Sequence, residues 1–103
     1  MAHAANPLGC LHLVMGSSRD ALERCLQLCD TGDTVLFLDA GVMHVTGEIE
    51  PPGAGDGPAL RFSRPDLQAR GLDRVARSGG AEVFEDSEFS TLLEAHALCL
   101  TWK

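Results

Sequence analysis

Residues 20–42 decide the fold, since they read DALERCLQLC over 20–29, DTG over 30–32 and DTVLFLDAGV over 33–42. On a helical wheel, the first part places its alanine, its leucines and both cysteines on one broad side and its charged residues mainly on the other. The run at 35–38 is apolar and contains β-branched and aromatic residues, which is typical of a buried strand. Gly32 ends the helix before this strand begins. The stretch therefore predicts a helix followed by a buried strand.

The rest of the chain continues this alternation. The pattern predicts further strands at residues 10–15, 59–63, 81–84 and 97–102, further helices at 65–70 and 87–96, and one helical turn at 41–45. Residues 51–58 hold too much proline and glycine for a helix or strand and are expected to form a loop. Strands that alternate with helices in a short chain favour parallel pairing. We therefore predict a three-layer α/β/α single domain with a mainly parallel sheet of about five strands.

Length and charge limit the classes of function. The 103 residues suit one domain, taken as residues 10–103 after a flexible N-terminal extension at 1–9. The formal net charge of −7 and the lack of a basic cluster argue against direct nucleic-acid binding. The apolar runs are too short for a membrane span, and the N-terminus does not resemble a signal peptide. A cytoplasmic protein with reduced cysteines is expected.

Cys25 is the candidate catalytic residue, and it has two interpretations. A thiol on this helix can pack in the core, which is the usual place of a free cysteine, or it can carry out sulfur chemistry. Periodicity alone favours packing. Cys29 lies one turn later and is expected to pack, as is Cys99 in its apolar strand. Cys10 starts a strand beside the flexible N-terminal tail, a position compatible with exposure, and nothing in the sequence assigns it a role. The chain holds no C-x-x-C, so it has neither a zinc knuckle nor a thioredoxin-type motif. No metal and no cofactor are expected.

Two histidines and the single tryptophan have structural explanations. His12 lies in an apolar strand, where a hydrogen-bonded structural role is expected. His96 ends a helix, where a cation interacts favourably with the helix dipole. Trp102 is expected to anchor the last strand or a subunit contact. The glycines of residues 53–57 do not make a nucleotide site, since they lack a lysine and are framed by prolines.

Several motifs together resemble one known family. They are LHLV at 11–14, ALERCL at 21–26, GDTVLFLDAGV at 32–42, DLQARGL at 66–72, then Phe89, Glu94, His96 and Trp102. In this order and spacing they resemble the DsrH/TusB-type subunits of the DsrE/DsrF/DsrH sulfur-relay family, over nearly the whole domain. Residues 15–18, Met-Gly-Ser-Ser, depart from the family's usual turn after its first strand.

The resemblance implies a function. Members of the family's sulfur-oxidation type resemble this chain in having a cysteine at the place of Cys25, whereas TusB-like members commonly lack it. The resemblance implies a subunit that handles persulfide sulfur in a heterohexamer with DsrE- and DsrF-like (TusD/TusC-like) chains, rather than a stand-alone enzyme. A DsrC/TusE-like carrier would accept the sulfur in dissimilatory sulfur oxidation. The alternatives are the tRNA 2-thiouridine relay and a non-catalytic structural subunit.

Overall fold

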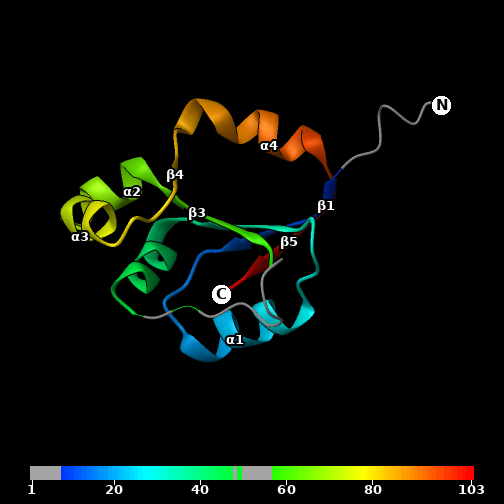
Figure 1. Ribbon diagram of the computed structural model, residues 1–103, viewed down its shortest axis with the longest axis horizontal. Coiled ribbons are helices and arrows are strands. Elements are labelled where there is room, and N and C mark those ends of the chain that lie inside the picture. The colour runs from blue at the N-terminus through cyan, green and yellow to red at the C-terminus, as the bar shows by residue number, and fades with distance from the viewer. Residues whose placement is uncertain (1–7, 48, 50–56) are drawn as a thin grey trace.

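The computed structural model describes residues 8–47, Ile49 and residues 57–103, which form a five-stranded sheet with helices on both faces (Figure 1). The sheet order is β4-β3-β2-β1-β5, and every neighbouring pair is parallel. The strands are β1 (Leu8–Val14), β2 (Thr34–Phe37), β3 (Ala59–Ser63), β4 (Val83–Phe84) and β5 (His96–Trp102). The predicted three-layer, parallel α/β architecture is confirmed.

The helices divide between the two faces of the sheet. Helix α4 (Phe89–Ala95) lies on one face and α1 (Arg19–Leu28) on the other, as Figure 1 shows. The 3-10 helix η2 (Asp39–Thr46) and the helices α2 (Arg64–Ala69) and α3 (Asp73–Ser78) pack on the same face as α1. The short 3-10 helix η3 (Asp86–Glu88) directly precedes α4. The larger buried apolar cluster contains residues of β1, β2 and β3 with α1, η2, α2 and α3. The smaller one joins the other face of the sheet to Phe89 and Leu92 of α4.

Local sequence explains where two helices begin. The Ser18 hydroxyl accepts a hydrogen bond from the Ala21 amide at 3.2 Å and so caps α1. Ser63 accepts from the Asp66 amide at 3.4 Å, and Pro65 lies in the first turn of α2, where its missing N–H costs nothing. The helices begin at Arg19 and Arg64, each one residue before the stretch in which the sequence predicts it.

Several boundaries differ from the prediction. Strand β1 begins at Leu8, two residues before the strand predicted at 10–15, and residues 1–7 of the extension expected at 1–9 lie outside the described part. Helix α3 was not predicted, because its six residues are too few to show a helical period. Strand β4 keeps only two of the four residues expected. Most of the loop expected at 51–58 also lies outside the described residues.

Strand β5 forms one edge of the sheet, and this position corrects the interpretation of Cys99. The strand pairs with β1 on one side, and its residues 97–101 are exposed. The prediction that Cys99 packs in the core was therefore wrong: an apolar edge strand has the same local pattern as a central one. Among the described residues, no helix is long and apolar enough to cross a membrane.

Candidate functional site

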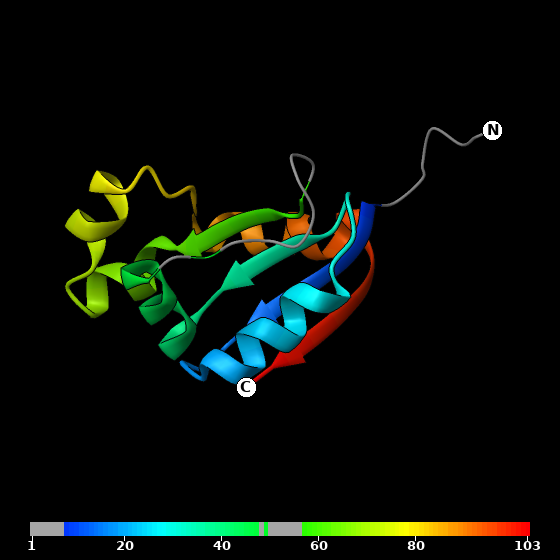
Figure 2. The same cartoon turned by 60° about the horizontal axis from the view of Figure 1, so that its bottom comes forward.

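Helix α1 brings two thiols to its inner face. Cys25 and Cys29 are four residues apart, so both face the sheet, and Cys25 has 0% of its surface exposed while Cys29 has 9%. One ring nitrogen of His12 on β1 and the two sulfur atoms all lie within 4.8 Å of one another. In Figure 2, α1 lies in front of the sheet over the side formed by β1 and β5. The structure thus brings together Cys25, Cys29 and His12, which the sequence treats as separate candidates.

His12 is held by hydrogen bonds at both ring nitrogens. The Trp102 indole N–H donates to Nδ1 at 3.1 Å, which leaves that nitrogen unprotonated. Nε2 then carries the proton and donates to Asp33 Oδ2 at 3.1 Å. The prediction that His12 is a hydrogen-bonded structural histidine is confirmed, and Trp102 anchors β5 to the core through it.

Asp33 completes the network, and the sequence reasoning missed it. Its Oδ1 accepts from the Cys10 amide at 2.9 Å, and its Oδ2 accepts from the Asp30 amide at 3.1 Å as well as from His12. Burial acts to raise the pKa of Asp33, but the hydrogen bonds from Cys10, Asp30 and His12 outweigh it and lower the pKa below its ordinary value. The one sequence feature that could have identified Asp33 is its position as a carboxylate directly before the buried strand β2.

Cys25, Cys29 and His12 offer the sulfur and nitrogen atoms of a metal site, but these atoms already take part in hydrogen bonds and core packing. A metal bound at His12 would have to displace either the Trp102 N–H or the Asp33 carboxylate. A hydrogen bond with Cys25 and burial both raise the pKa of the Cys29 thiol, whereas a metal ligand must be a thiolate. In this arrangement the three side chains form part of a packed, hydrogen-bonded core.

Burial also limits what Cys25 can do as a nucleophile. Sulfur transfer requires a thiolate that reaches the outer sulfur of a persulfide, so its rate depends on access. Cys25 packs in the core cluster between α1 and the sheet and has no exposed surface. Cys25 as a catalytic residue stays a prediction, and its burial favours the packing interpretation. Cys29 is buried as predicted, Cys10 is half-buried and Cys99 is exposed.

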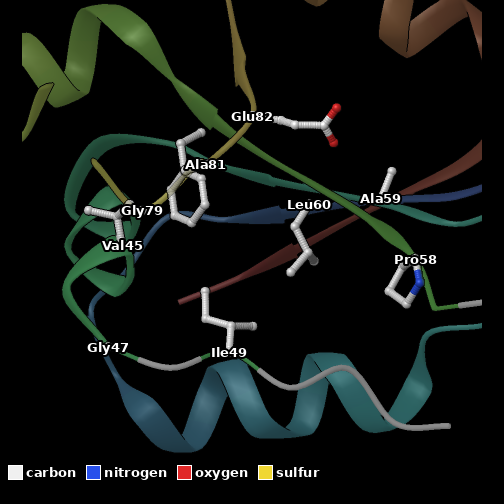
Figure 3. A pocket seen from close by; sticks show the side chains of 11 residues that line it. Val45, Gly47, Ile49, Pro58, Ala59, Leu60, Gly79, Ala81 and Glu82 are labelled. Atoms are coloured by element: carbon white, nitrogen blue, oxygen red, sulfur yellow. The ribbon is translucent and has the colours of Figure 1, made fainter. Parts of the chain in front are cut away.

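The structure also holds an open groove away from these thiols. It has a volume of about 390 Å³ and lies between the end of η2, strand β3 and residues 79–82, which connect α3 to β4. Figure 3 shows the side chains of Val45, Ile49 and Leu60 around it. Among the described residues that line it there is no cysteine or histidine, and Glu82 is the one ionisable residue, so this described lining offers no nucleophile for sulfur chemistry.

His96 has a structural role, as predicted, but hydrogen bonds produce it rather than the expected interaction of a cation with the helix dipole. It caps the C-terminal end of α4, with Nδ1 2.6 Å from the Leu92 carbonyl oxygen and Nε2 2.9 Å from Thr34 Oγ1. Two hydrogen bonds therefore fix the ring where α4 passes into β5.

Comparison with known families agrees with this architecture. The family model described as DsrH like protein matches residues 16–98, which is most of the chain. A search among curated proteins found no match to the chain. The protein belongs to the DsrH-like family, the DsrH/TusB-type branch of the sulfur-relay proteins.

Proposed function

We propose that the protein is a structural subunit of a cytoplasmic sulfur-relay complex, in which Cys25 packs the core and carries no sulfur. The family match supports membership of such a complex. The single observation that carries the structural role is the complete burial of Cys25 between α1 and the sheet. This choice favours the non-catalytic alternative over persulfide handling by this chain.

The partners follow from the family resemblance. DsrE- and DsrF-like chains would form the heteromeric complex, and a DsrC-like carrier would receive the sulfur. In that transfer the carrier thiolate attacks the outer sulfur of a partner persulfide, a new S–S bond forms on the carrier, and the partner thiolate leaves. The present chain would hold the assembly together. The cysteine at position 25 favours sulfur oxidation as the pathway, with tRNA 2-thiouridine synthesis as the alternative.

The Cys25→Ala variant tests this role in the assembled complex. We expect coexpressed DsrE- and DsrF-like subunits to copurify with the variant, and sulfur transfer to the carrier to stay within about twofold of the wild-type rate. Alanine removes a buried sulfur without stranding a hydroxyl, so the free energy of unfolding should fall by only about 0.5–3 kcal/mol. Mass-detected persulfide on the carrier measures the transfer.

Two controls define the outcome. Cys99→Ala removes an exposed thiol and should leave both stability and transfer unchanged. The family resemblance implies that the principal persulfide cysteine belongs to the DsrE-like subunit, so loss of that cysteine should abolish transfer. A Cys25→Ala complex that assembles and is stable but transfers no sulfur would overturn the structural role. A chain that copurifies with neither partner would contradict membership of the complex.

A further inference from the structure

A second, smaller cavity opens at the carboxyl end of the sheet, where the first turn of α1 lies beside η2 (Figure 2). Its volume is about 240 Å³. The described residues that line it are Ser17, Arg19, Met43, His44, Thr46 and Gly47. In open α/β sheets, ligands bind outside the carboxyl ends of the strands. The cavity therefore occupies the position where this fold places a ligand.

His44 is the buried polar residue of this cavity. It is 6% exposed, and its Nε2 lies 3.1 Å from the Gly16 carbonyl oxygen. A carbonyl oxygen can only accept, so Nε2 carries the proton and Nδ1 is left as an acceptor. No described residue donates a hydrogen bond to Nδ1. Every fully buried side-chain nitrogen or oxygen of the described residues has a partner, so Nδ1 is in contact with the cavity.

Arg19 brings positive charge to the same cavity. It is the first residue of α1, and a Cβ built on Gly47 would lie 3.5 Å from its Nη1 atom. It also pairs with Glu23 at 3.6 Å, but the five N–H donors of a guanidinium can serve several acceptors at once. The positive N-terminal end of α1 favours an anion at this place as well.

The protonation state of His44 limits which anion fits. Burial lowers the pKa of His44 below its ordinary value; the hydrogen bond to Gly16 opposes this shift, and the charge of Arg19 adds to it. The imidazole is therefore neutral at neutral pH, with an unprotonated Nδ1 in the cavity. A ligand that matches both groups must be an anion for Arg19 and must also carry a proton to donate to Nδ1.

We propose that this cavity binds inorganic phosphate, whose hydroxyl donates to His44 Nδ1 while two of its oxygens accept from the Arg19 guanidinium. Inorganic phosphate keeps at least one proton at neutral pH, whereas sulfate has the same shape and keeps none. The Ser17 hydroxyl is a further donor on the wall of the cavity. The site does not depend on the proposed relay function, and one of its walls is the turn at residues 15–18 that departs from the family's usual sequence.

Titration of the full chain with sodium phosphate tests the site, followed by ¹H–¹⁵N NMR at about pH 7.5 and constant ionic strength. We expect saturable amide shifts at Ser17, Arg19 and Gly47, with a Kd of about 1 mM or tighter. Sulfate should cause no such shifts at this pH. A phosphate monoester should bind more weakly than inorganic phosphate, because it has largely lost its last proton above its second pKa of about 6.

Acid should remove the discrimination against sulfate. As the pH falls through the lowered pKa of His44, Nδ1 gains a proton and can donate to a sulfate oxygen. Bound sulfate in turn favours the charged imidazole, so it should raise the pKa of His44. The ¹⁵N shifts of the His44 ring report this protonation directly.

Two arginine variants with the same change in charge separate a site from general attraction. Arg19→Gln should weaken phosphate binding about tenfold or more. Arg24→Gln is the matched control, because Arg24 lies on the same helix, pairs with Asp20 and has a side chain that is 68% exposed. It should change the Kd by less than about twofold.

His44→Gln probes the acceptor. Glutamine keeps an N–H donor for the Gly16 carbonyl and removes Nδ1, so this variant should lose the preference for phosphate over sulfate. Circular dichroism checks the fold, and the arginine pair decides the question if His44→Gln is unfolded. The proposal is overturned if phosphate causes no saturable shift at the cavity, if sulfate binds equally well at neutral pH, or if the two arginine variants bind phosphate alike.

Discussion

Replacing Asp33 with asparagine is expected to lower the free energy of unfolding by about 2–4 kcal/mol, because buried N–H groups lose their acceptor. Both carboxylate oxygens accept: Oδ1 from the Cys10 amide, and Oδ2 from the Asp30 amide and from His12 Nε2. Asparagine offers one oxygen and turns an NH₂ group toward the remaining donors. Denaturant unfolding followed by circular dichroism measures the loss.

Asp30→Asn is the control for this substitution. Asp30 is exposed, and its contribution to the network is its backbone amide, so the variant should lie within about 0.5 kcal/mol of wild type. The pKa of Asp33 is lowered on folding, so its contribution is present above pH of about 4 and is lost as the pH falls through the lowered pKa. The difference between wild type and Asp33→Asn should therefore shrink in acid. Equal stability of the two proteins at neutral pH would contradict the network.

Replacing Gly41 with alanine is expected to cost about 3 kcal/mol or more and to reduce the yield of folded protein. A Cβ at this position would lie 1.9 Å from the Val14 carbonyl oxygen and 2.8 Å from its carbon. That oxygen already accepts a hydrogen bond from the Leu38 amide at 3.0 Å, so the backbone of β1 cannot move away without breaking it. The substitution should thus separate η2 from β1.

Gly79→Ala provides the comparison for Gly41. A Cβ there would meet its nearest atom, the Val75 carbonyl oxygen, at 3.5 Å, and the backbone is in the right-handed helical region. This variant should be neutral or slightly more stable, because alanine restricts the unfolded chain. If Gly41→Ala unfolds at the same denaturant concentration as Gly79→Ala, the result would contradict the close approach of Gly41 in η2 to the Val14 carbonyl group of β1.

Much of the fold could be predicted because its signals are local. The apolar period of α1 and the buried run of β2 each occupy a few consecutive residues. Helix α3 and strand β4 are too short to show a period, which is why one was missed and the other was predicted too long. The exposure of Cys99 depends on which strand forms the edge, and strand order has no local signal.

The candidate site was less predictable than the fold. Cys25 could be placed on the inner face of its helix from periodicity. Its neighbours come from distant segments: Asp33 is 21 residues from His12, and Trp102 is 90 residues from it. These contacts depend on the register of β1 against β2 and β5. Cys25 and His12 could therefore be singled out from the sequence, whereas the hydrogen-bond network of His12, Asp33 and Trp102 beside the thiols could not be predicted.

The most direct test of a structural role for Cys25 is the mass of its own peptide in the sulfur-loaded complex. The assembled wild-type complex would be supplied with a persulfide donor, alkylated without reduction and digested. We expect the added sulfur atom on a partner's cysteine and on the carrier, and unmodified Cys25, since its thiol is enclosed by α1 and the sheet. Alkylation after unfolding should recover Cys25 as a free thiol. A peptide that carries one additional sulfur on Cys25, formed at the rate of transfer to the carrier, would contradict the structural role.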